Sequence, residues 1–147
     1  LTLWGDRSAR LPAWFIKLFP STYRATRLFD PKMPTRTGLQ PLPNGRADVL
    51  VSAPERALLE LLSDVGKGQS LSEAKHLVEG LPSLRPKMLD TLLMHTTRVK
   101  VVRLAHALAT ASGQSWAKVT AMHDQRLGKA GWVAVTKSGE RIDLRRS

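Results

Sequence analysis

The pattern of hydrophobic and polar positions divides the chain into an early part with short extended segments and a later part with helical periodicity. In the early part, loose alternation and short apolar runs predict strands at Leu1–Trp4, Tyr23–Phe29, Leu39–Leu42 and Ala47–Val51. Residues Ala13–Leu18, after Pro12, suit one or two helical turns. The segment Asp30–Gly45 contains four prolines and two glycines, so we expect mostly loop there.

Helical spacing begins at residue 52 and predicts four helices. We expect these at Ala53–Val65, Ser70–Gly80, Pro86–Thr96 and Val99–Ser112. Ser52 and Glu55 have the spacing of a capping box at the start of the first helix, and Ser70 and Glu73 repeat it at the second. Pro54 suits the first turn of its helix, where a missing N–H costs little. A predicted core stripe follows on the first helix, formed by Ala57, Leu58, Leu61, Leu62 and Val65.

The end of the chain predicts a β-hairpin, formed by Trp132–Val135 and Arg141–Leu144 around Ser138-Gly139. The fold class is therefore α+β. We expect one domain over residues 1–147, with a mixed β-rich part (1–51), a central bundle of about four helices (52–112) and a tail with the hairpin (113–147).

Net charge and the absence of cysteine limit the classes of function that the chain can have. The formal charge of the 147-residue chain is +11, and it is uneven: residues 1–84 have 11 Lys/Arg against 8 Asp/Glu, and residues 85–147 have 12 against 4. Such a basic half suits a polyanion, usually nucleic acid, or an acidic protein. Cysteine is absent, which excludes disulfides and thiol nucleophiles and fits a cytoplasmic protein. No apolar run is long enough for a transmembrane helix, so we expect no membrane association.

Candidate chemistry is sparse. The four histidines, at 76, 95, 106 and 123, have no metal-ligand spacing, and no nucleophile elbow or phosphate-binding glycine loop is present. Gly66-Lys67-Gly68 is interpreted as a plain turn between helices rather than an anion site. We therefore predict no catalytic, cofactor or metal residues and no cofactor. The aromatic residues of the early part are expected in the core: Trp4, Trp14, Phe15, Phe19 and Phe29.

The best candidate surface is the basic fourth helix. One face of this helix is apolar, with Val101, Leu104, Ala105 and Leu108 in register. A predicted cationic ridge lies along other positions and consists of Arg85, Lys87, Arg98, Lys100 and Arg103. Three interpretations remain open: a solvated face that only keeps the protein soluble, a nucleic-acid contact whose strength falls with salt, or a surface for an acidic protein.

Several segments carry a family resemblance. Ser52–Glu60 resembles the S-x-P-E-R-A-L-L-E motif of the AbiEi family, antitoxins of type IV toxin–antitoxin (abortive infection) systems. Further segments resemble the family in the same order: Leu1–Gly5 with Leu11–Phe15, Leu84-Arg85-Pro86, Val99–Leu104, Gly113–Trp116 and Leu127–Lys129. Nearly the whole chain is covered. Glu140–Arg146 departs from the family, whose last segment is rich in Tyr and β-branched residues.

The resemblance implies a bifunctional, non-enzymatic regulator that acts in phage defence. Its N-terminal winged helix-turn-helix binds operator DNA and represses the operon, and its C-terminal domain counteracts a nucleotidyltransferase toxin without a stable complex. This chain corresponds to the C-terminal domain. It begins at Leu1 inside a predicted strand, so we expect a fragment. The alternatives are a DNA- or RNA-binding domain that uses the basic helices, and a protein-interaction or oligomerisation module; the oligomeric state is not predicted.

Overall fold

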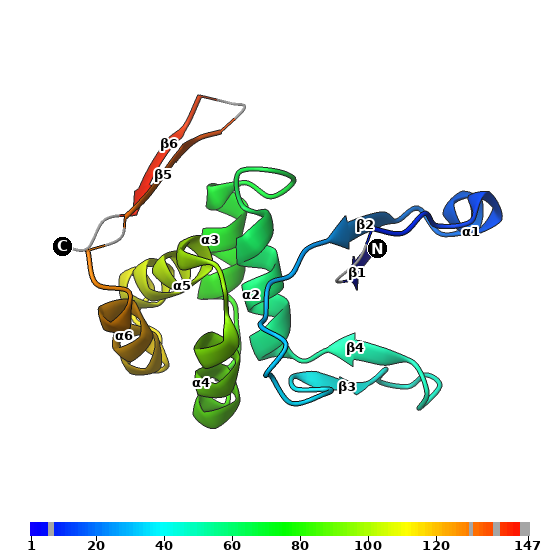
Figure 1. Ribbon diagram of the computed structural model, residues 1–147, viewed down its shortest axis with the longest axis horizontal. Coiled ribbons are helices and arrows are strands. Elements are labelled where there is room, and N and C mark those ends of the chain that lie inside the picture. The colour runs from blue at the N-terminus through cyan, green and yellow to red at the C-terminus, as the bar shows by residue number, and fades with distance from the viewer. Residues whose placement is uncertain (6–7, 130, 137–138, 145–147) are drawn as a thin grey trace.

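A computed structural model describes residues 1–5, 8–129, 131–136 and 139–144 (Figure 1). The architecture is α+β, with short strands first, helices next and an antiparallel hairpin last, which confirms the predicted fold class. The elements are β1 (Thr2–Gly5), α1 (Ala13–Leu18), β2 (Thr22–Ala25), β3 (Leu39–Pro41), β4 (Leu50–Ser52), α2 (Pro54–Asp64), α3 (Leu71–Glu79), α4 (Pro86–His95), α5 (Val99–Ala111), α6 (Ala117–Arg126), β5 (Trp132–Val135) and β6 (Arg141–Leu144).

Within the described residues, the strands pair two by two and lie around the helices (Figure 1). β1 and β2 are parallel, with Leu3 opposite Tyr23, and α1 lies in the crossover that parallel strands require. β3–β4 and β5–β6 are antiparallel, and the second pair is the predicted hairpin. Two strands are shorter or shifted relative to the sequence pattern, because β2 ends at Ala25 and β4 begins only at Leu50.

The core lies among α2, α4, α5 and α6, with α3 contributing Ala74 and Val78. The predicted apolar face of α5 is buried. On α2 the stripe is rotated relative to the prediction. Leu59 is fully buried, whereas Ala57 is exposed and Leu61 only partly buried. The N-terminal half of α2 buries Glu55 in place of an apolar side chain, which the periodicity did not indicate.

The start of α2 differs from the predicted capping box. Ala53 is the N-cap, and no side chain caps the helix, although Pro54 occupies the first turn as expected. The Ser52 hydroxyl instead donates to Glu60 Oε2 at 2.7 Å, and the Glu55 carboxylate accepts a hydrogen bond from the Arg85 N–H. The capping box at α3 is confirmed, because the Ser70 hydroxyl accepts from the Glu73 N–H at 3.1 Å and Glu73 bonds back to the Ser70 N–H.

Helix α6 lies where the sequence predicted only a tail. Its buried residues are Thr120, His123 and Asp124, a set with helical spacing but with polar side chains. Apolar periodicity cannot detect such a face. Trp116, just before α6, is 1 % exposed and anchors the helix in the core.

The expectation that all the early aromatic residues belong to the core is wrong for Trp4, which lies outside the core cluster, and for α1. None of its residues is buried, Trp14 is 63 % exposed, and Phe19 just after it is 51 % exposed. Trp14 and Phe15 instead contact each other edge to face, with ring centres 5.8 Å apart. Figure 1 shows α1 at the far end of the β1–β2 ribbon, away from the helices. No helix in the described parts of the chain is long and apolar enough to cross a membrane.

Candidate nucleic-acid interface

Arg103, one of the five residues of the predicted cationic ridge, faces α6 instead of solvent. Its Nη1 donates to Asp124 Oδ1 at 2.7 Å, its Nη2 donates to the Gly128 carbonyl at 2.7 Å, and its side chain is 2 % exposed. A buried guanidinium needs such partners to offset its lost hydration. Because α6 covers this face of α5, Arg103 is not part of any exposed ridge.

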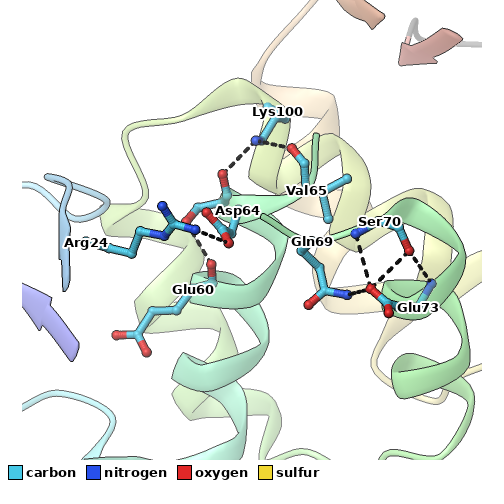
Figure 2. A network of polar contacts seen from close by, with 9 residues as sticks. Arg24, Glu60, Asp64, Val65, Gln69, Ser70, Glu73 and Lys100 are labelled. Atoms are coloured by element: carbon cyan, nitrogen blue, oxygen red, sulfur yellow. Dashed lines mark hydrogen bonds and ion pairs between the residues drawn. The ribbon is translucent and has the colours of Figure 1, made fainter. Parts of the chain in front are cut away.

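Lys100 is also partly withdrawn from the surface. Its Nζ donates to the carbonyl oxygens of Ser63 and Val65, at 2.7 and 2.9 Å, which lie at the C-terminal end of α2 (Figure 2). Helix ends leave such carbonyls without partners and favour a nearby cation. The same Nζ lies 5.3 Å from the centre of the Trp132 ring, a cation–π distance. Lys100 therefore links α2, α5 and β5.

The pKa of Lys100 shows which charges surround it. Burial of the ammonium is the largest cause that lowers this pKa, from 10.5 to about 8. The positive charges of Lys67 and then Arg98 lower it further, whereas Asp64 raises it. Two further cations therefore lie close to Lys100, and the cations that gather at the end of α2 are Lys67, Arg98 and Lys100.

The remaining predicted cations lie elsewhere. Arg85 is the N-cap of α4 and pairs with the buried Glu55, with 2.9 Å between Nη2 and Oε2. Lys87 is exposed in the first turn of α4, and Arg98 is exposed at the start of α5. The ten residues of α4 separate these two starts by about 15 Å along the helix. The five predicted residues therefore do not form one continuous surface.

Figure 2 shows a polar network at the C-terminal end of α2, in which the sequence predicted the Ser70–Glu73 capping box but not the contacts of Arg24 and Asp64. Arg24 of β2 donates from Nη2 to Asp64 Oδ2 at 3.1 Å and so joins the N-terminal ribbon to α2. The local pattern did identify the turn after Asp64. It is a plain turn as predicted, because the N–H groups of Lys67, Gly68 and Gln69 all donate to the Asp64 carbonyl. The residues of the turn do not indicate which distant side chains pack on it.

Comparison of the chain with known families identifies its class of protein. The family described as transcriptional regulator, AbiEi antitoxin, type IV TA system, matches residues 1–145. The chain belongs to this family. No curated protein and no solved structure was found to match the chain. The AbiEi antitoxin family is regulatory and not catalytic.

Three of the four histidines of this AbiEi-family chain link separate segments. They pair with side chains of other elements, at nitrogen–oxygen distances of 2.7 to 3.2 Å: His95 with Asp30, His106 with Thr120 and His123 with Asp90. His76 is exposed on α3. Among the described residues, no group of three or more His, Asp or Glu is placed to hold a metal ion.

Proposed function

We propose that this chain is the antitoxin domain of a type IV toxin–antitoxin regulator and counteracts a nucleotidyltransferase toxin in the cytoplasm. The full-length protein would also repress its own operon by binding operator DNA. The observation that carries this proposal is the family match over residues 1–145, because the family is one of antitoxins and transcriptional regulators. The core of helices gives the chain a body of its own on which such a surface can be presented.

The antitoxin role is tested by co-expression. Cells that express the cognate nucleotidyltransferase toxin from an inducible promoter should survive when this chain is supplied. Leu62→Asp, which places a charge in the core, should abolish survival because the domain no longer folds. Leu77→Asp, at a position 52 % exposed on α3, is the matched control and should protect like the wild type. Continued cell death in the presence of folded wild-type chain would sink the proposal.

We further propose that protection needs no stable complex between chain and toxin. Light scattering coupled to size exclusion should then give separate masses for the two proteins when they are mixed. A shared peak at the summed mass would contradict this part of the proposal while leaving the antitoxin role intact. The same measurement on the chain alone gives its oligomeric state and tests the alternative that it is a self-association module.

A second candidate function is a supporting contact to operator DNA through the exposed cations Lys87 and Arg98, with Lys100 nearby. It is favoured by the absence of hydrogen-bonded partners for Lys87 and Arg98 side chains among the described contacts. The charge reversals Lys87→Glu and Arg98→Glu should weaken operator binding by the full-length protein and lower its salt dependence. Retention of wild-type repression and an unchanged salt slope would remove this candidate.

A further inference from the structure

A groove lies between the N-terminal ribbon and helix α2. It consists of two neighbouring hollows. One, of about 410 Å³, is lined by β1, by residues 26–36 and by α2, and the other, of about 220 Å³, is lined by β1, β2 and the end of α2. Trp4 and Thr26 line both hollows, so a chain that occupies both passes beside these two residues.

Aromatic side chains are distributed along this groove. Tyr23 lines the smaller hollow, Phe29 lines the larger one, and Trp4 lies between them. All three are only partly buried. The guanidinium of Arg56 lies 5.1 Å from the centre of the Phe29 ring. Partly exposed rings next to arginines are the kind of surface on which flat heterocycles stack.

The net charge of the side chains that line the groove is positive. Five cationic residues line it against three carboxylates. Glu60 pairs with Arg56 and Asp64 with Arg24, and Asp30 is hydrogen-bonded to His95. The groove also contains Arg27, Arg36 and Lys67, which are exposed. In the part of the chain that the structure describes, none of these three pairs with a carboxylate. Phosphates would find cations in both hollows.

We propose that this groove binds single-stranded nucleic acid, with bases stacked at Trp4 and phosphates bound by Arg27, Arg36 and Lys67. Stacking on aromatic side chains together with a basic track is how proteins bind single strands without reading sequence. A duplex keeps its bases stacked inside and cannot offer them to Trp4. An acidic peptide would satisfy the cations but would offer no flat heterocycle to stack on Trp4. This inference does not depend on the proposed antitoxin activity.

The test measures binding of the whole chain to labelled probes by fluorescence anisotropy. The probes are oligouridylate and oligodeoxythymidylate of about 12 nucleotides, a length within single-strand site sizes, with a duplex and oligoglutamate of similar length for comparison. We expect saturable binding of one or both single strands. With three phosphate contacts, affinity should fall about 20-fold between about 50 and about 200 mM salt. Tighter binding of oligouridylate would identify RNA as the bound nucleic acid, and tighter binding of oligodeoxythymidylate would identify DNA.

The variants separate stacking from charge. Trp4→Ala should weaken binding about tenfold with the salt dependence unchanged, since it removes a stack and no cation. The pair Arg27→Glu/Arg36→Glu should weaken binding and reduce the salt dependence to about a third. The control pair Lys118→Glu/Arg126→Glu makes the same charge change on exposed positions of α6, on the opposite side of the molecule in Figure 1, and should bind like the wild type.

Trp4 lies outside the core cluster, so its removal should leave the helical circular dichroism signal intact. Three results would overturn the proposal: no saturable binding of either single strand, equal or tighter binding of the duplex or of oligoglutamate, or a folded Trp4→Ala variant that binds as the wild type does.

Discussion

At the scale of single residues, buried carboxylates fix the helices to one another. Glu55 is 2 % exposed and accepts hydrogen bonds from the Arg85 N–H at 2.8 Å and from its guanidinium at 2.9 and 3.1 Å. Burial acts to raise the pKa of Glu55, but the bonds from the Arg85 side chain and backbone outweigh it and lower the pKa below its ordinary value. Glu55 is thus a charged link between the starts of α2 and α4.

Glu55→Gln should lower the free energy of unfolding by about 2 kcal/mol at neutral pH, because it weakens charged hydrogen bonds in a buried place. Since the folded-state pKa is depressed, the contribution of Glu55 is complete above its unfolded value of 4.5 and is lost as the pH falls through the folded value. Urea unfolding across this range should show a smaller loss in the variant. Glu79→Gln, exposed on α3, is the control. Parallel pH profiles for wild type and Glu55→Gln would refute the argument.

Lys100 gives a pH dependence of the same sign, but at higher pH and from a different cause, the burial of its ammonium. Its folded-state pKa of about 8 lies below its unfolded value of 10.5, so between these values the unfolded chain binds more protons. The stability of the wild type relative to Lys100→Met should therefore rise with pH through that window. Chemical unfolding at several pH values measures the difference. Lys118→Met, exposed on α6, controls for the loss of one positive charge. A relative stability that falls with rising pH would show that the carbonyl contacts of Lys100 dominate over its burial.

At the scale of elements, local signals predicted helix boundaries well where the partners of a side chain are also local. Ser70 and Glu73 form the capping box that their spacing indicates, within one turn of α3. Ser52 and Glu55 have the same spacing but do not, because Glu60 and the distant Arg85 compete for them. Contacts over thirty residues depend on the packing of the helices and are not available from a three-residue pattern.

Ser70→Ala should therefore destabilise the domain by about 1 kcal/mol, through the lost cap of α3. Ser72→Ala, an exposed position on the same helix, should be close to neutral or slightly stabilising, because alanine has the higher helix propensity. Thermal unfolding of both variants makes the comparison. A larger loss for Ser72→Ala than for Ser70→Ala would contradict the role of the cap.

Helix α6 is the element that the sequence pattern missed, and its polar buried face explains both the miss and a strong mutational effect. Asp124→Ala removes the partner of a buried arginine and should cost about 3 kcal/mol. The double substitution Arg103→Met/Asp124→Leu removes both charges and should recover part of this loss, since no unpaired charge is left inside. Urea unfolding of the single and double variants forms the test. A double variant less stable than Asp124→Ala would mean that packing, not the unpaired charge, sets the cost.

At the scale of the whole molecule, the order of strands, helices and hairpin followed from periodicity, whereas the placement of charge did not. Arg103 and Lys100 were grouped by helical spacing, yet α6 covers the first and the end of α2 holds the second. The groove beside Trp4 combines residues from β1 to α2 that no local pattern brings together. A surface is made by several elements, so its prediction requires their relative placement.

The same placement predicts unequal local stability. The β1–β2 ribbon lies outside the core cluster and is a two-stranded sheet, which is marginal by itself, whereas α2 and α5 supply much of the core. In native-state hydrogen exchange, amides of α2 and α5 should exchange only through global unfolding, and those of β1 and β2 through smaller openings. Asp64→Asn, which weakens the Arg24 contact between ribbon and α2, should speed exchange in β2 more than in α5. Equal protection of the ribbon and the helices would mean that the ribbon unfolds together with the core. The groove would then be a rigid part of the domain, and would not be bordered by a strand pair that opens separately.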